Sequence, residues 1–390
     1  MRKRLALICV LLTLLGCGDK TTRYTNTPGL FVAGTAFYEK PGVNGTRLSP
    51  FTSRTPITCA AVQIINPADN NRVIVLGQTD ENGEYKIDIP LELATTPLNV
   101  RILAKSADTK LPFVVRRHDN SIISAGETYS VDSDPFVGKT VGLTVVATRS
   151  SGLAGAFNIY EFTNKGFKFV QEKAEPNTKF PSLLIHWAKD EDGIGCTCFL
   201  NGIFRPHRIN IRGMSDPEEF DDSVILHELG HYMHESFSDT DSPGGFHSVS
   251  CSTNQVIDPR LAWSEGWATG FGQMVLGDRR YIDTHPNGGF ILDIEYPCSV
   301  QQGPYSEIVI SAMYWDLFDG SDSGVPTRDG DTMNLTFNQI WTAMKDISAS
   351  GATVKDFYLS LRRKGFITTD QWNQNFLQLG IDEVAILSVP

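Results

Sequence analysis

The sequence has fewer basic than acidic residues and no hydrophobic run long enough to cross a membrane. The 390-residue chain contains 34 Lys and Arg and 45 Asp and Glu, so its formal net charge is −11. Removal of residues 1–16, which include Arg2, Lys3 and Arg4, would change that charge to −14. This acidity argues against nucleic acid as a partner and against electrostatic binding to anionic lipid.

Cysteine is also scarce, with seven in the chain. Two of them, Cys9 and Cys17, lie in the N-terminal leader. Four others lie in the second part of the chain and can form two disulfide bonds in three ways that the sequence does not separate: Cys196, Cys198, Cys251 and Cys298. We expect Cys59 to remain free. A cysteine zinc site is the competing interpretation, but Cys196 and Cys198 are only one residue apart.

The leader predicts export and lipid attachment. Basic residues precede the apolar run Leu5 to Leu15, and the following Leu14-Leu15-Gly16-Cys17 resembles a bacterial lipobox. A run of about 11 residues is too short for a membrane span. We therefore expect residues 1–17 to be a lipoprotein signal and lipobox, with cleavage before Cys17 and lipidation of Cys17. Gly18 favours the outer membrane, on its periplasmic or surface face; an ordinary secretory signal is the alternative.

After a polar tether at residues 18–28, residues 29–148 predict a β-sandwich. Seven short runs of β-branched and aromatic residues carry this prediction: 30–38, 60–65, 73–77, 84–89, 99–104, 113–115 and 141–147. Asn82-Gly83 predicts a hairpin turn. The region resembles the carboxypeptidase-regulatory-like, immunoglobulin-like modules of exported bacterial proteins, and its expected role is that of a spacer or adhesive module.

The strongest chemical signal is His227-Glu228-Leu229-Gly230-His231, within the apolar segment Ser223 to Glu235. Two histidines four residues apart lie on one face of a helix, so both imidazoles can reach one ion. Glu228 lies beside them, where it can take a proton from a water on that ion. This spacing predicts a zinc site on a buried helix.

A third ligand is predicted at Glu265, in the segment Ala262 to Ala268. This carboxylate stands among tryptophan, alanine and glycine, where an unpaired charge would be costly to bury. Glu265 follows His231 by 34 positions, which is far enough for a second helix to return to the ion. Zn²⁺ with the protein ligands His227, His231 and Glu265 and an open fourth position has the arrangement of a catalytic site.

The two motifs HELGH and SEGWA resemble those of the gluzincin metallopeptidases, the thermolysin-like group, and the later IVISAMYWDLFD is most similar to the fungalysin branch. The resemblance covers about residues 154–343. It implies a zinc peptidase in which Glu228 is the general base. One position departs from the pattern, because Thr269 stands where thermolysin and fungalysin have an aspartate that supports a zinc histidine.

The mechanism implied by this resemblance needs a donor to the oxyanion of the tetrahedral intermediate. Tyr305 is the first candidate for this catalytic role, ahead of four others: Tyr281, His285, Tyr296 and Tyr314. His247, in a Gly- and Pro-rich loop, either enters the cleft or remains a solvated loop residue. We expect His234 not to be a ligand.

Two further patterns concern the surroundings of this helix. The alternation in residues 207–212 predicts an edge strand, along which a substrate could add itself as a strand or which simply faces solvent. Asp216, Pro217 and Glu219 predict the start of the active-site helix, with Asp216 as the N-cap.

The overall prediction is an α+β protein with a β-sandwich followed, at residues 149–390, by a mainly helical zincin-type domain with a small sheet. Three amphipathic helices are expected at its C-terminal end, within residues 337–347, 353–364 and 369–379. The expected function is zinc-dependent hydrolysis of peptide bonds, in a peptide or protein substrate, by a membrane-anchored lipoprotein. A surface adhesion protein that keeps the fold without turnover is the alternative. The sequence fixes neither the substrate nor the oligomeric state.

Overall fold

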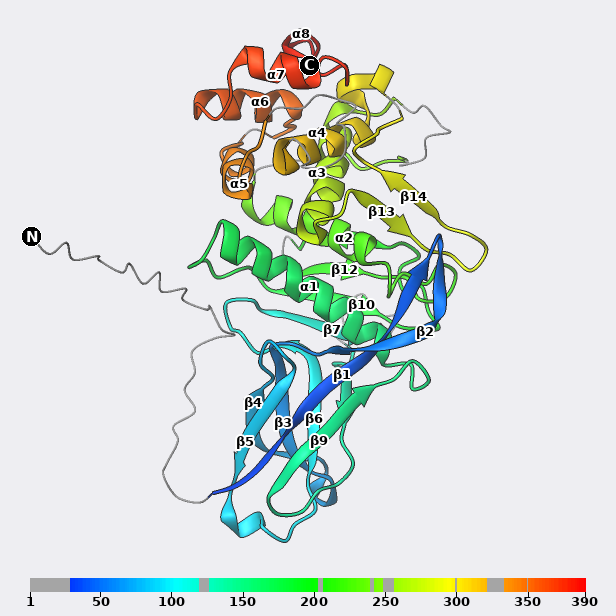
Figure 1. Cartoon of the computed structure of the whole chain (residues 1–390), viewed down its shortest axis with the longest axis vertical. Coiled ribbons are helices and arrows are strands. Elements are labelled where there is room, and N and C mark those ends of the chain that lie inside the picture. The colour runs from blue at the N-terminus through cyan, green and yellow to red at the C-terminus, as the bar shows by residue number, and fades with distance from the viewer. Residues whose placement is uncertain are drawn as a thin grey trace, which may run out of the picture.

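The chain has an α+β structure, with strands in its first part and helices in its second (Figure 1). The predicted signal, the tether and Cys17 lie outside the described residues, as does Cys251. The computed structural model describes residues 29–118, 126–202, 206–238, 242–247, 256–298, 300–320, 333–348 and 350–390.

Every run predicted to be a strand in the first part forms one. The strands are β1 (Leu30–Asn44), β2 (Arg47–Pro56), β3 (Ala60–Asn66), β4 (Arg72–Gln78), β5 (Glu84–Ile89), β6 (Asn99–Ser106), β7 (Phe113–Arg117), β8 (Ser130–Asp132) and β9 (Thr140–Ala147). Strand β5 shows why these runs form strands. Its residues Tyr85, Ile87 and Ile89 are buried, and the residues between them are exposed. The two-residue period thus gives each strand one face in the core.

The turn predicted at Asn82-Gly83 is present, but it does not close a paired hairpin. Gly83 has a φ of 74°, and the Asp80 carboxylate accepts hydrogen bonds from the backbone N–H groups of Asn82 and Glu84. The flanking strands then enter different sheets. β5 joins a four-stranded sheet with β1, β2 and β9, whereas β4 ends an eight-stranded sheet. The turn therefore carries the chain from one sheet to the other.

The eight-stranded sheet extends past residue 148, where the sequence predicted a domain boundary. Its order is β11-β12-β10-β7-β6-β3-β4, with β8 on β6. The later strands are β10 (Leu183–Trp187), β11 (Cys198–Leu200) and β12 (His207–Asn210). β10 pairs in parallel with β7 from the first part, and one hydrophobic core continues through both parts. The two predicted units therefore share a sheet and a core.

The prediction that residues 207–212 form the edge of this sheet is wrong. β12 lies between β10 and β11, and the short strand β11 is the outermost one among the described residues. Cys198 begins this strand and is disulfide-bonded to Cys196. A three-residue strand next to a disulfide has too few residues to show alternation, which is why the sequence pattern did not reveal it.

The disulfide prediction holds in part. The bond between Cys196 and Cys198 lies within the second part of the chain, and Cys298 is also disulfide-bonded. Cys59 is disulfide-bonded as well, so the expectation that it stays free is wrong. That expectation considered pairing only among the four cysteines of the second part.

The second part contains the helices α1 to α8, in chain order α1 (Ala154–Lys173), α2 (Asp222–Phe237), α3 (Pro259–Leu276), α4 (Glu307–Asp319), α5 (Phe337–Lys345), α6 (Val354–Arg363), α7 (Thr369–Phe376) and α8 (Glu383–Leu387). A two-stranded hairpin, β13 (Arg280–Asp283) and β14 (Phe290–Asp293), follows α3. The three helices predicted near the C-terminus are confirmed as α5, α6 and α7. Each begins at a threonine that forms a capping box.

The start of α2 differs from the prediction. The helix begins at Asp222, with Asp221 as the N-cap residue, and not at Pro217 after Asp216. Asp216 instead forms an ion pair with Arg212, and the Asp221 carboxylate accepts hydrogen bonds from Thr284. These tertiary contacts replace the local capping pattern that the sequence suggested.

Helices α2 and α3 are in close contact at Gly230, where there is no side chain to separate them. A Cβ atom at Gly230 would lie 2.7 Å from the Cα atom and 2.9 Å from the carbonyl oxygen of Ala268. Trp267 donates a hydrogen bond from its indole N–H to the Gly230 carbonyl oxygen at 3.0 Å. On its other side α3 packs against α4, so it lies between two helices (Figure 1).

Strand β1 reaches from the first part to the start of α2. The Lys40 ammonium lies 2.7 Å from the Asp222 carboxylate and 2.9 Å from Asn158 Oδ1, and it sits over the Phe162 ring. At the tip of the β1–β2 hairpin, the Thr46 carbonyl accepts hydrogen bonds from the loop between β13 and β14. Strand β1 thus contacts the helix that carries the HELGH motif.

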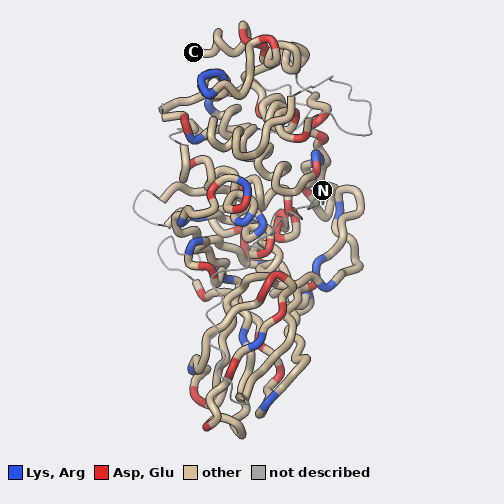
Figure 2. The backbone as a smooth tube through the Cα atoms, turned by 60° about the vertical axis from the view of Figure 1, so that its left-hand side comes forward, with Lys and Arg blue, Asp and Glu red and all other residues tan. Residues whose placement is uncertain are grey.

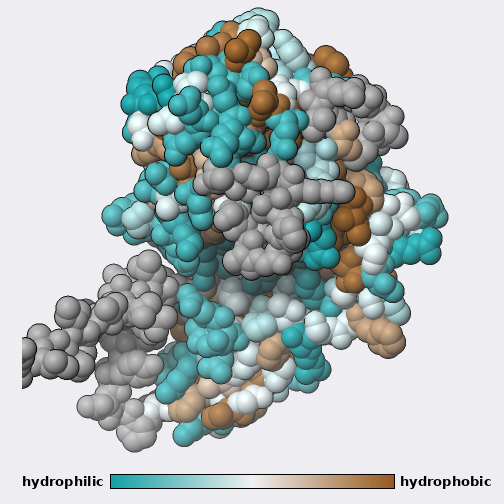
Figure 3. Space-filling model, turned by 45° about the horizontal axis from the view of Figure 1, so that its top comes forward, coloured by the Kyte–Doolittle hydropathy of each residue, from teal (hydrophilic) through white to brown (hydrophobic). Residues whose placement is uncertain are grey.

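Charge and hydropathy are mixed over the described residues that Figures 2 and 3 show. Acidic and basic segments are interspersed along the whole molecule (Figure 2), and on the face shown in Figure 3 hydrophobic patches alternate with hydrophilic ones. Within the described ranges, no helix combines the length and the hydrophobicity that a membrane crossing requires.

Candidate metal centre

Helices α2 and α3 bring the three predicted ligands together. His231 Nε2 lies 3.1 Å from His227 Nε2 and 3.1 Å from Glu265 Oε2, and His227 Nε2 lies 3.2 Å from the same oxygen. Ligand atoms about 2.0–2.2 Å from a tetrahedral zinc ion lie about 3.3–3.5 Å apart. The three atoms therefore form a triangle that fits one zinc ion. Among the described residues, these three ligands come from the two helices α2 and α3.

Hydroxyl groups orient the two histidines. His227 Nδ1 lies 3.0 Å from Thr269 Oγ1, and His231 Nδ1 lies 3.4 Å from Ser264 Oγ. When a neutral imidazole keeps its Nδ1 proton and donates it to a hydroxyl, the Nε2 lone pair is left for a metal. Thr269 thus supports His227 at the position where the resemblance led us to look for an aspartate. The sequence did not single out Ser264, although its place next to Glu265 on α3 was a usable signal.

Glu228 is buried beside the three ligands. Burial raises the pKa of its carboxyl group, and the nearby His227 and His231 oppose that rise. One carboxylate oxygen, Oε2, has no hydrogen-bond partner among the described residues, while the backbone of Phe199 in β11 provides a hydrogen bond to the carboxylate. The edge strand therefore holds the Glu228 side chain in place. Its second carboxylate oxygen stays free to accept a proton, as a general base requires.

Glu265 carries the negative charge of the ligand group. Burial by itself would raise the pKa of this carboxyl, but the adjacent His231 and His227 outweigh burial and hold the pKa well below its usual value. The group consequently offers one anionic and two imidazole ligands, a set that suits zinc.

The loop histidine His247 reaches the same centre. Its Nδ1 lies 2.8 Å from Glu307 Oε2, and its Nε2 lies 3.8 Å from Glu265 Oε1. The hydrogen bond to Glu307 raises the pKa of His247 to about 9, so the ring is held as a cation. Of the two alternatives left by the sequence, the structure supports the cleft position. Glu307 was missed because an acidic residue in the first turn of a helix usually only compensates the helix dipole.

The tyrosine candidates occupy different environments. Among the described residues the Tyr305 hydroxyl has no hydrogen-bond partner, although its carbonyl accepts one from the Ile257 N–H. Tyr281 packs edge-on against His227, with 6.2 Å between the ring centroids. Tyr314 lies in the aromatic core, and Tyr296 lies under Arg279. The role predicted for Tyr305 stays a prediction.

Two other histidines lie away from the ligand triangle. His234 is buried between the rings of Trp263 and Trp267, and burial lowers its pKa to about 3, so it stays neutral. The group that could hold a metal here consists of His227, His231 and Glu265. His285 lies 4.0 Å from Asp216, on the loop after β13.

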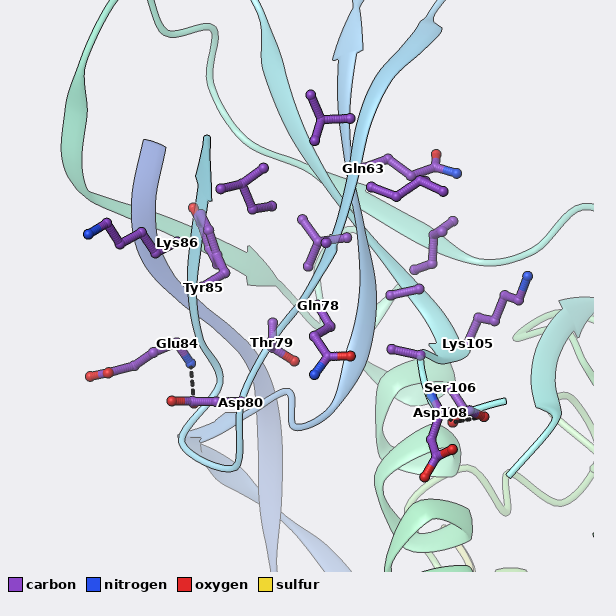
Figure 4. Close-up of a pocket in the computed structure, with 18 of the residues that line it drawn as sticks. Gln63, Gln78, Thr79, Asp80, Glu84, Tyr85, Lys86, Lys105, Ser106 and Asp108 are labelled. Atoms are coloured by element: carbon purple, nitrogen blue, oxygen red, sulfur yellow. Dashed lines mark hydrogen bonds between the residues drawn. The ribbon is translucent and has the colours of Figure 1, made fainter. Parts of the chain in front are cut away.

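A broad groove in the first part of the chain has no comparable chemistry. Figure 4 shows its polar lining, with Lys86 and Glu84 on one side and Lys105 and Asp108 on the other. The one aromatic residue in its lining is Tyr85, which is buried and donates its hydroxyl proton to the Leu143 carbonyl. An exposed ring for stacking on a sugar is therefore missing among the lining residues.

Comparisons with known proteins bear on the second part of the chain. The family described as "Mycolysin C-terminal domain" matches residues 170–378, which contain all three ligands and Glu228. This match relates the chain to a family of zinc-dependent peptidases. An uncharacterized protein of Archaeoglobus fulgidus is 30% identical over 102 residues, which are 26% of this chain and 29% of that protein. The match thus spans less than a third of this relative.

Among solved structures, the major plantain pollen allergen Pla l 1 matches with 16% sequence identity and a TM-score of 0.17. The match covers 30% of this chain and 92% of the allergen. A similarity this low carries no conclusion about fold or function.

Proposed function

Because this chain belongs to the Mycolysin C-terminal domain family, we propose that it is a zinc peptidase that hydrolyses peptide bonds in peptide or protein substrates. The observation that carries the proposal is the triangle of His227 Nε2, His231 Nε2 and Glu265 Oε2, with sides of 3.1–3.2 Å. Zinc bound there would supply a Lewis acid that polarises the scissile carbonyl group.

The residues of the chain perform the proton transfers. The Glu228 carboxylate accepts a proton from the attacking water and then donates it to the leaving amine. Strand β11 is the outermost strand of its sheet among the described residues, and it is tied to Glu228 through Phe199. An extended substrate paired with β11 would thus place its backbone beside the general base.

Zinc content is the measurement that tests this function first. Protein comprising residues 18–390 should contain about one zinc per chain by elemental analysis, and a Glu265→Ala variant should lose it, since one of three protein ligands is removed. The same samples are assayed on mixed peptides with and without a chelator. Zinc together with chelator-sensitive cleavage supports the peptidase. Zinc without cleavage would favour a binding protein, and a chain without zinc would refute the site.

We further propose His247, held by Glu307, as the donor to the oxyanion, in preference to Tyr305. A His247→Gln variant is expected to lower kcat by about 10²–10³-fold with a small change in KM, because the donor acts on charge that develops in the transition state. Zinc content is measured in parallel, since His247 lies near Glu265.

The comparison variant for this assignment is Tyr305→Phe, which removes only a hydroxyl. A larger loss of kcat in Tyr305→Phe than in His247→Gln, with zinc retained in both, would give the role to Tyr305 instead.

The proposed location is the cell envelope. We propose that Cys17 is lipidated after cleavage of the signal, which would anchor the enzyme to the outer membrane by its N-terminus. Mass spectrometry of the membrane fraction, with a Cys17→Ser variant as control, distinguishes a lipoprotein from a freely exported protein.

A further inference from the structure

A second group of oxygen ligands lies between the start of α2 and the β13–β14 hairpin. Glu218, Asp221 and Asp283 each place one carboxylate oxygen within 4.8 Å of the others. Glu218 is 4% exposed and Asp221 is 2% exposed, so two of the three carboxylates are almost completely withdrawn from water. None of the three belongs to the zinc triangle.

The Glu218 carboxylate lacks a complete set of partners. Its Oε1 lies 3.8 Å from an Arg212 nitrogen, beyond hydrogen-bond distance, and its Oε2 has no hydrogen-bond partner among the described residues. Asp221, in contrast, accepts hydrogen bonds from the Thr284 N–H at 3.0 Å and from the Thr284 hydroxyl at 2.7 Å. A buried carboxylate oxygen without a donor is costly unless the group is protonated or a water or cation lies beside it.

The positive charge around the group does not balance its negative charge. Arg212 is paired with Asp216, and His285 lies 4.0 Å from that same aspartate. Asp222 has its own partner in Lys40. The carboxylates of Glu218, Asp221 and Asp283 thus share one arginine that already has a partner.

The protonation of the group reflects this imbalance. Burial, together with the neighbouring carboxylates, raises the pKa of Glu218 to about 10, and burial raises those of Asp221 and Asp283 to about 8 and about 6. At neutral pH the cluster therefore retains protons that carboxylates in water would lose. A bound divalent cation would take the place of these protons.

We propose that Glu218, Asp221 and Asp283 bind a calcium ion. All three ligands are carboxylate oxygens, which hard cations prefer, and the group contains no nitrogen or sulfur that would select zinc. The partly exposed Asp283 leaves room for water ligands, and calcium accepts the irregular geometry of ligands from a loop, a helix start and a strand.

The ion would link structural elements that support the metal centre. Asp221 is the N-cap residue of α2, and Asp283 ends β13, whose Tyr281 packs against His227. A cation between Asp221 and Asp283 would fix the hairpin against the zinc helix. It would stabilise the folded chain without taking part in the reaction.

Calcium titration of the zinc-loaded protein tests the proposal. In buffer freed of calcium by a chelating resin, isothermal titration with CaCl₂ should show about one site per chain, and millimolar calcium should raise the Tm. In Glu218→Gln and Asp283→Asn the affinity should fall about tenfold or more. An Asp293→Asn variant removes a carboxylate from the same hairpin outside the group and should bind calcium as the wild type does.

The pH dependence provides a second readout. Carboxyl groups with a raised pKa in the folded state add stability at low pH. That stability falls as pH rises from the ordinary carboxyl pKa of about 4 up to the folded values of about 6 to 10. The calcium-induced rise in Tm should consequently be larger at about pH 8 than at about pH 5.5. Glu218→Gln should fold without calcium, because it removes a buried charge, and should lose most of the calcium response.

Two outcomes would overturn the proposal. The first is a wild-type chain that binds no calcium at millimolar concentration while holding its zinc. The second is calcium binding with the same affinity in wild type, Glu218→Gln and Asp283→Asn. Elemental analysis for zinc on every sample shows whether the peptidase centre is intact, so the failure of one site is distinguished from failure of the other.

Discussion

Replacing Glu228 with glutamine should lower kcat for peptide hydrolysis by about 10²–10⁴-fold while zinc remains bound. The amide has nearly the shape of the carboxylate but cannot accept the proton of the attacking water. The three ligand atoms belong to His227, His231 and Glu265, so the substitution leaves the triangle unchanged. Substrate affinity should change little, because the lost proton transfer belongs to the transition state.

The matched control for this variant is Glu235→Gln. Glu235 lies on the same helix seven residues later, and its carboxylate accepts a hydrogen bond from Asn201. Its substitution removes the same charge from α2 without touching the proposed base, so turnover should stay close to that of the wild type. If Glu228→Gln lost its zinc, or if it retained turnover, the roles assigned here would be wrong.

The second large effect is expected at Gly230, where a single added methyl group should damage the metal centre. In Gly230→Ala the new Cβ would lie 2.7 Å from the Ala268 Cα atom. This clash involves backbone atoms, so the rotation of a side chain cannot remove it. Helices α2 and α3 must then move apart. This movement would separate the metal ligands, because His231 follows Gly230 directly and Glu265 lies on α3. We expect a loss of about 1–3 kcal/mol in the free energy of unfolding and weaker zinc binding.

Gly272→Ala on α3 is the control for this prediction. A Cβ there would lie 3.4 Å from its nearest neighbours, an ordinary contact, and both variants gain the same helix propensity. Denaturant unfolding and competition for zinc with a chelator measure both effects. Equal stability and equal zinc affinity in the two variants would show that the close helix contact is unimportant.

The residues of the proposed zinc site could be predicted because their signals are local or compositional. The spacing of His227 and His231 follows from the helix period, and Glu265 stands out as a lone acid in an apolar segment. The individual strands were equally readable, since each has its own two-residue alternation. These features depend on a few neighbouring residues, which a single sequence contains.

What the sequence could not provide depends on contacts between distant segments. Glu307 meets His247 across 60 positions, and Asp221 meets Thr284 across 63. A local pattern predicted Asp216 as the N-cap. In the folded chain Asp216 forms an ion pair with Arg212 instead. The role of a carboxylate depends on the side chains that pack against it. Those side chains can lie far away in the sequence, so the residues next to the carboxylate do not reveal them.

The contact between Lys40 and Asp222 has a consequence for the order of folding. It joins positions 182 residues apart, and the pairing of β7 with β10 encloses the whole of β8, β9 and α1. Contacts of such long sequence separation form slowly, because a large loop must close before they contribute. The zinc helix should therefore reach its final position only after the first strand has docked. The proposed metal centre would thus be completed late in folding, after the two parts of the chain have paired.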